Sequence, residues 1–133
     1  MYLRFVQLKI VLGMRAREGI FSAAYELKHA SKADRHTQSQ LEDILSWFGQ
    51  NLAVPSRFNL SSSKGYDRKV VTYGLSWYKP AARDHLKKSY ELAALLRQNG
   101  YSIEIIKTSR PGYVLYEDEH QIVAEPFADS GGL

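Results

Sequence analysis

Carboxylates and an imidazole gather near the end of the chain, where residues 116–120 read Tyr-Glu-Asp-Glu-His. On a β-strand Glu117 and Glu119 would share a face, because successive side chains alternate between the two faces. Carboxylates beside His120 could hold a divalent cation or exchange a proton as general acid and base. The same residues are also typical of a wet connection between two strands, and no further His or Asp lies at a metal-binding spacing. We therefore expect no metal site and keep Glu117, Glu119 and His120 as the candidate acid–base residues.

A second group combines cations with aromatic rings. Cations neutralise phosphates and exposed rings stack on unpaired bases, so this combination is typical of surfaces that hold single-stranded nucleic acid. The alternative interpretation is a scatter of surface cations around aromatic residues of the core. The candidates are Arg57, Lys64, Arg68 and Lys69 in a predicted loop, Tyr78 and Lys79 at a strand end, and Arg110 and Tyr113 near the following hairpin.

The common catalytic signatures are absent from the sequence. It contains no HExxH zinc motif, no GxGxxG dinucleotide loop, no GxxxxGK[ST] phosphate loop and no GxSxG nucleophile elbow. The absence of cysteine excludes disulfides and thiolate chemistry. The sequence therefore favours a protein that is not an enzyme and needs no cofactor.

The two groups lie in parts of the chain that differ in charge. Residues 1–100 carry sixteen Lys and Arg against eight Asp and Glu, whereas residues 101–133 carry two against six. The first part therefore has a net charge of +8 and the second −4, which gives the +4 of the whole chain. A basic body favours an anionic partner, and an acidic end can dock on another surface or shield the basic one.

Hydrophobic periodicity predicts the elements of the first half. Residues 2–12 predict a strand, and apolar residues at helical spacing predict a short helix over 18–29. A longer helix is predicted to end near Asn51 or Leu52, because the residue before Pro55 is disfavoured in a helix. Ser39 and Glu42 form a capping-box pattern, which predicts the start of this helix. Residues 57–60 predict a short strand that leads into a polar loop.

The second half alternates strands with one helix. Residues 70–79 predict a strand with Leu75 and Trp77 on the core face and Tyr78 on the other face. Pro80 fits the first turn of a helix, and Asn99-Gly100 would end it in the left-handed conformation. Further strands are predicted over 101–107, 113–116 and 121–124, the last two joined as a hairpin.

This order predicts an α+β fold, a two-layer sandwich with ferredoxin-like β-α-β-β-α-β order, an extra N-terminal helix and a C-terminal β-hairpin. We expect one domain over residues 1–128 and a flexible tail over 129–133. No stretch approaches the roughly 18 apolar residues that a membrane helix needs, and the N-terminal residues do not resemble a signal peptide. The expected location is therefore the cytoplasm, without a membrane partner.

Three functions remain open. The favoured one is a small non-catalytic, regulatory binding protein whose partner is nucleic acid, held by the basic and aromatic group. The second is a protein-interaction or inhibitor module that uses Glu117, Asp118 and Glu119 with a sheet edge, and a homodimer falls within this class. The third is a small hydrolase or nuclease in which His120 acts with Glu117 or Glu119.

Overall fold

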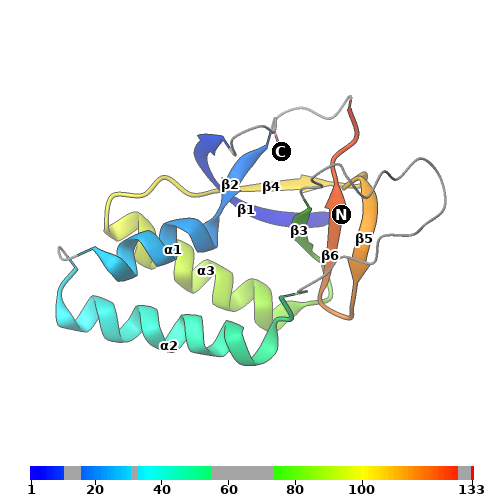
Figure 1. Ribbon diagram of the computed structural model, residues 1–133. Helices are drawn as coiled ribbons and strands as arrows, with labels where there is room; N and C mark the ends of the chain where they lie inside the picture. Colours follow the sequence, from blue (N-terminus) through cyan, green and yellow to red (C-terminus); the bar gives the residue numbers. More distant parts are fainter. Residues whose placement is uncertain (11–15, 31–32, 55–73, 129–132) are drawn as a thin grey trace.

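The computed structural model describes residues 1–10, 16–30, 33–54, 74–128 and 133. Within these ranges the chain forms an antiparallel sheet of six strands and three α-helices, and the helices lie together on one face of the sheet (Figure 1). The elements in chain order are β1 Tyr2–Ile10, β2 Arg17–Gly19, α1 Ile20–His29, α2 Arg35–Asn51, β3 Leu75–Tyr78, α3 Arg83–Gln98, β4 Glu104–Thr108, β5 Tyr113–Glu117 and β6 Gln121–Glu125.

Strand β1 is the centre of the sheet. Along one edge it pairs with β4, from Tyr2 opposite Thr108 to Val6 opposite Glu104. Its other edge is shared, because β3 pairs at Leu3 and β2 pairs from Val6 onward. Beyond β3 the sheet continues with β6 and then β5, which is the last strand in that direction. Two pairings therefore meet the same edge of β1, with residues 4 and 5 between them.

Both faces of the sheet bury apolar side chains. Alternate residues of a strand point to opposite faces, and the clusters follow that rule: Tyr78 and Ile105 belong to the cluster under the helices, whereas Trp77 and Ile106 belong to a cluster on the opposite face. The first cluster also takes in Phe5 of β1, and the second takes in Tyr2 of the same strand. Strands β1 and β3 are therefore shared by two cores.

The helix boundaries depend on capping groups close in sequence. Helix α2 begins at Arg35 rather than at Ser39, because Asp34 adopts an extended conformation and its Oδ1 accepts a hydrogen bond from the Thr37 amide at 2.7 Å. The start predicted from the capping box was therefore wrong, whereas the predicted end near Asn51 is confirmed. Helix α1 begins at Ile20, since residues 17–19 pair with β1 as a short strand.

Helix α3 starts later than its proline suggested. Pro80 lies in a turn, and the helix begins at Arg83 after an N-cap at Ala82. At the other end Gly100 has φ of +93°, so the predicted left-handed stop is confirmed. The C-terminal hairpin is also confirmed, as β5 and β6 pair from Tyr113 opposite Glu125 to Glu117 opposite Ile122.

The α+β class, with helices layered on an antiparallel sheet, is confirmed. The predicted strand over 57–60 and the first residues of the strand over 70–79 lie outside the described residues, so the ferredoxin-like order, which needs that strand, is not confirmed. Residues 129–132 of the predicted tail also lie outside them, and Leu133 packs against the cluster that contains Trp77. None of the three helices is both long and apolar enough to cross a membrane.

Candidate functional site

The carboxylate of Asp118 is used within its own hairpin. Its Oδ1 accepts hydrogen bonds from the amides of His120 at 2.8 Å and Gln121 at 3.0 Å, and its Oδ2 accepts one from the Tyr116 hydroxyl at 2.8 Å. Partial burial raises the pKa of Asp118, but these hydrogen bonds outweigh it and hold the pKa below its usual value. Asp118 is thus a deprotonated group that shapes the turn between β5 and β6.

The carboxylates on either side of Asp118 have different surroundings. The Glu117 carboxylate lies 2.6 Å from Lys79 Nζ, which joins the acidic hairpin to the end of β3. The Glu119 side chain is 91% exposed, with its nearer oxygen 4.0 Å from His120 Nε2. Of the three acidic residues predicted to meet a protein partner, only Glu119 projects freely from this turn. Lys79, a predicted phosphate contact, is neutralised by Glu117.

His120 lies against a second, buried histidine. The rings of His120 and His85 are stacked, with centroids 4.2 Å apart and planes 26° apart. The buried His85 donates from Nε2 to the Asn51 carbonyl at 2.7 Å, at the C-terminal end of α2. A shallow cavity of about 380 Å³ borders His120, the end of α2 and the hairpin turn. The stack therefore fixes the hairpin against α2 and α3.

The predicted basic and aromatic group is only partly brought together. Arg57, Lys64, Arg68 and Lys69 lie outside the described residues. Tyr78 does not face outward as predicted: it is buried under the helices, edge-on to Phe5, and it is unavailable for stacking on a base. Burial raises the pKa of Tyr78 to about 12, an effect that the nearby Ser89 hydroxyl partly offsets, although neither hydroxyl makes a hydrogen bond of normal geometry.

Arg110 and Tyr113 do come together, through a ring that the sequence had not singled out. The Arg110 guanidinium lies 4.9 Å from the centre of the Phe127 ring, and Tyr113 meets the same ring edge-on at 4.8 Å. Tyr113 is 61% exposed and Val114 beside it is 51% exposed, on a strand whose only described partner is β6. We call Arg110, Tyr113 and Phe127 the rim cluster. Phe127 lies only two residues past β6, where no periodic pattern marks it.

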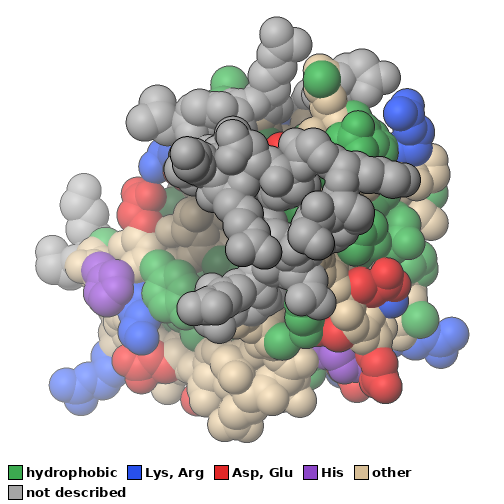
Figure 2. All heavy atoms as spheres, turned by 45° about the vertical axis from the view of Figure 1, so that its right-hand side comes forward, with side chains coloured by type: hydrophobic (Ala, Val, Ile, Leu, Met, Phe, Trp, Pro, Cys, Tyr) green, Lys and Arg blue, Asp and Glu red, His purple; other side chains and the backbone are tan. Residues whose placement is uncertain are grey.

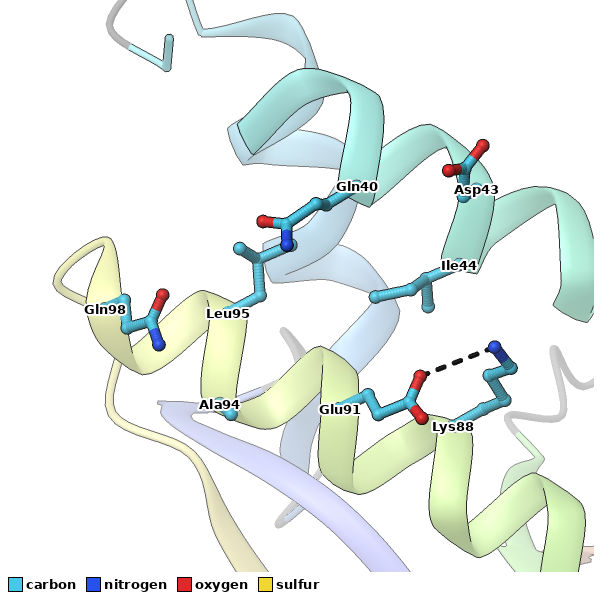
Figure 3. A pocket seen from close by; sticks show the side chains of 8 residues that line it. All are labelled: Gln40, Asp43, Ile44, Lys88, Glu91, Ala94, Leu95 and Gln98. Carbon is cyan, nitrogen blue, oxygen red and sulfur yellow. Dashed lines mark ion pairs between the residues drawn. The ribbon is translucent and has the colours of Figure 1, made fainter. Parts of the chain in front are cut away.

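Charge on the visible surface is mixed. Among the coloured side chains of Figure 2, Lys and Arg lie near Asp and Glu and do not gather into a continuous cationic area. A groove of about 440 Å³ between α2 and α3 shows the same mixture, with Lys88 Nζ 3.4 Å from Glu91 Oε2 beside Ile44 and Leu95 (Figure 3). Such a lining is typical of a solvated seam between helices.

The sequence analysis missed one buried arginine and a partly buried arginine beside it. Arg4 of β1 is 6% exposed, and Arg17 of β2 lies beside it. Each has one buried guanidinium nitrogen without a hydrogen-bond partner, Nη1 of Arg4 and Nη2 of Arg17. Burial, followed by the charge of Arg17, lowers the pKa of Arg4 to about 10, which still leaves it protonated at neutral pH. The only signal was a cation inside an apolar strand, which is also what a half-exposed strand shows.

No protein-family model, curated protein or solved structure matches the chain. Within the residues that the structure describes, no group of three or more His, Asp or Glu side chains is placed to hold a metal ion. The geometry of the sites above is therefore the basis for a functional proposal.

Proposed function

We propose that the protein is a non-catalytic binding protein whose partner is single-stranded nucleic acid, contacted through the rim cluster. The observation that carries this proposal is the Phe127 ring, held between the Arg110 guanidinium and the edge of an exposed tyrosine. Aromatic faces stack on bases without regard to sequence, and an arginine beside them can neutralise a phosphate or stack on a base itself. Arg57, Lys64, Arg68 and Lys69 lie outside the described residues and stay predicted phosphate contacts.

The test is binding of labelled single-stranded RNA and DNA, followed by fluorescence anisotropy at two salt concentrations. We expect affinity to fall steeply with salt, since each phosphate contact releases counterions. Tyr113→Ala should weaken binding about 5- to 150-fold, because one base stack contributes about 1–3 kcal/mol. The matched control is Tyr25→Ala on α1, which removes a tyrosine that is 49% exposed and has Lys28 over its ring at 6.0 Å.

Two results would contradict the proposal. One is the absence of binding at low salt, and the other is an equal effect of Tyr113→Ala and Tyr25→Ala. Hydrolysis of either oligonucleotide that His120→Ala removes would instead favour the nuclease hypothesis, to which the geometry gives little support. His120 is stacked on His85, and the Glu119 carboxylate, 4.0 Å from His120 Nε2, is almost fully exposed.

The second candidate is a protein-interaction module that adds a strand to β5. The observation in its favour is that Tyr113 and Val114 are exposed side by side on a strand with one described neighbour. Such an edge can pair with another chain, including a second copy of this one. Sedimentation equilibrium of the wild type and Val114→Lys distinguishes this function: a dimer that the variant dissolves supports the edge, and a monomer at all concentrations removes the homodimer.

We also propose that the whole fold has the ferredoxin-like order. Strands β3 and β4 both run antiparallel to β1, which lies between them, and α3 connects them. This split arrangement is a part of the ferredoxin-like pattern. The strand over 57–60 is the element that the pattern still requires.

A further inference from the structure

The turn from α3 to β4 contains an Asn-Gly pair. Asn99 is the C-cap of α3, and Gly100 follows it with φ of +93°. Both residues are exposed, and a Cβ at Gly100 would have no described atom within 4 Å beyond its neighbours in the chain. The residue after Asn99 thus has neither a side chain of its own nor neighbours that crowd it.

An asparagine followed by glycine can modify itself, and asparagine is among the thermolabile residues. The backbone nitrogen of Gly100 attacks Cγ of Asn99, a C–N bond forms, and the side-chain nitrogen leaves as ammonia with the proton of the backbone amide. Water then adds to one carbonyl of the cyclic imide and breaks one of its two C–N bonds. Cleavage at Cγ gives aspartate, and cleavage at the backbone carbonyl gives isoaspartate.

The folded turn keeps both reacting groups occupied. Nδ2 of Asn99 donates to the Leu95 carbonyl at 2.8 Å, and the Gly100 amide donates to the Arg97 carbonyl at 3.2 Å. The ψ angle of Asn99 is 18°, which turns the Gly100 nitrogen toward the Asn99 backbone nitrogen and away from the side chain. Attack on Cγ therefore requires the turn to open first.

The side chain of Arg97 holds this turn closed. Its Nε and Nη2 donate to the Ile103 carbonyl at 3.2 Å and 2.6 Å. Ile103 is buried directly before β4, so the two bonds fasten the end of α3 to the start of that strand and span the Asn-Gly pair between them. Hydrogen bonds from a charged donor are stronger than neutral ones. The contact between Arg97 and Ile103 therefore opposes the fraying that is usual at a helix end.

The chain contains a close comparison at the end of α2. Asn51 is also exposed, and its Nδ2 donates to the Trp47 carbonyl at 2.8 Å, which is the same bond to the fourth preceding residue that Asn99 makes. Asn51 is followed by Leu52, and the third asparagine of the sequence is also followed by leucine. A branched side chain beside the attacking nitrogen hinders the reaction, so Asn99 is the asparagine that the sequence favours for it.

We propose that Asn99 is a site of spontaneous deamidation, and that the contact of Arg97 with the Ile103 carbonyl sets the rate by controlling how often the turn from α3 to β4 opens. This inference does not depend on the proposed function. The reaction consumes water and releases ammonia, and it needs no enzyme.

The product is a carboxylate in an unfavourable place. It lies at the negative end of the α3 dipole, and it can no longer donate to the Leu95 carbonyl. It also borders a cavity of about 670 Å³ that already contains the carboxylate of Glu26. Deamidation therefore weakens the end of α3, and the isoaspartate product in addition lengthens the backbone of the turn by one methylene group.

The first experiment incubates the wild type at mildly alkaline pH, in native buffer and in concentrated urea, and follows deamidation by mass spectrometry of proteolytic peptides. We expect Asn99 to react in both, more slowly in native buffer, because the closed turn protects it. Asn51 should stay intact in both over the same period. The proposal is overturned if Asn99 reacts no faster than Asn51 in native buffer.

The second experiment tests the contact that closes the turn. Arg97→Gln should speed deamidation of Asn99 in native buffer about tenfold, because hydrogen bonds from a charged donor are lost, and should leave the rate in urea unchanged. Arg83→Gln removes an exposed cation at the other end of α3 and is the matched control. Equal native rates for the two variants would contradict the role given to Arg97.

Hydrogen exchange separates opening of the turn from unfolding of the whole protein. In Arg97→Gln the amide of Gly100 should exchange faster than in the wild type, while the amide of the buried Leu92 in the same helix keeps its rate. Equal acceleration of both amides would mean that the variant opens the whole domain, and the proposed local control would then be wrong.

A product mimic tests the effect on stability. Asn99→Asp should lower the midpoint of urea unfolding, because the Nδ2 hydrogen bond is lost and a charge is added at the end of α3. Gln98→Glu adds the same charge one residue earlier and keeps that hydrogen bond, so it should lower the midpoint less. A midpoint of Asn99→Asp at or above that of the wild type would overturn the destabilising effect assigned to deamidation.

Discussion

At the scale of single residues, the carboxylate of Asp118 is held by several hydrogen bonds within its own hairpin. Its two oxygens accept from two backbone amides and one tyrosine hydroxyl, so both are occupied within the hairpin. The hydrogen bond from the Tyr116 hydroxyl to Asp118 also raises the pKa of Tyr116, since ionising that hydroxyl would remove the donor and place two negative charges together. Asp118 therefore has a structural role, which is to fix the conformation of the turn between β5 and β6.

Removal of the Asp118 carboxylate should therefore cost stability in a pH-dependent way. Asp118→Ala is expected to lower the free energy of unfolding by about 1–3 kcal/mol at pH 7, because hydrogen bonds to a charged group are lost. The pKa of Asp118 is lower in the folded state. Its contribution is thus complete above the unfolded pKa of about 3.9 and disappears as the pH falls through the folded value.

Urea denaturation of wild type and Asp118→Ala at several pH values from 7 to 2 measures this difference. Glu119→Ala is the matched control, since that side chain is 91% exposed and makes no contact of comparable strength. A stability difference that stays constant down to pH 2 would show that the carboxylate charge is not what holds the turn.

At the scale of elements, periodicity was a good guide where an element is long and packs by one face. The end of α2, the last three strands and the glycine stop of α3 follow from apolar spacing and from Gly100. Short elements were not predictable in this way. Strand β2 has three residues, and it forms because Gln7 and Arg17 bind backbone carbonyls across the pairing with β1.

Local sequence also offered two caps for one helix. Asp34 and Ser39 are both good N-cap residues, and the capping box favoured Ser39. Starting at Asp34 adds a turn that contains the buried Thr37. Tertiary packing therefore decided between two caps that sequence reasoning could not rank.

The start of the β5–β6 hairpin requires a glycine at position 112. Its φ is +137°, and a Cβ there would lie 1.9 Å from the Glu125 carbonyl oxygen, at the point where β5 begins its pairing with β6. Gly112→Ala is expected to destabilise the protein by about 2–4 kcal/mol, because both the backbone conformation and the close approach are lost.

The control for this substitution is a glycine that has room for a Cβ. Gly49 lies inside α2, and a Cβ added there would have no described atom within 4 Å outside its own helix turn. Gly49→Ala should therefore stabilise the protein by about 0.5–1 kcal/mol through helix propensity. Chemical denaturation of both variants measures the two signs. Equal, small effects would mean that the β5–β6 hairpin tolerates a shift of its first residue.

At the scale of the whole molecule, the sequence did not reveal that the sheet is buried on both faces. A strand buried on both sides loses the alternation that sequence analysis relies on, and residues 4–7 of β1 are buried in succession. The burial of Arg4 was not predicted for this reason. At one edge of β1 the strands β2 and β3 and the start of α1 meet, and no local pattern encodes such a meeting.

The two cores should nevertheless unfold as one unit. Strand β3 places Tyr78 in the core under the helices and Trp77 in the core on the opposite face, and β1 does the same with Phe5 and Tyr2. Loss of either core therefore removes the support of strands that the other one needs. We expect a single cooperative transition, as is usual for a domain of this size.

Trp77 makes this expectation measurable. The chain has two tryptophans, and Trp47→Phe leaves Trp77, which is fully buried, as the only one. In that variant, tryptophan fluorescence follows the core opposite the helices, while far-ultraviolet circular dichroism follows the helices themselves. The two curves should coincide in urea with one midpoint and one slope. If the fluorescence changes at a lower urea concentration than the helical signal, the core opposite the helices opens on its own while the helical core stays folded.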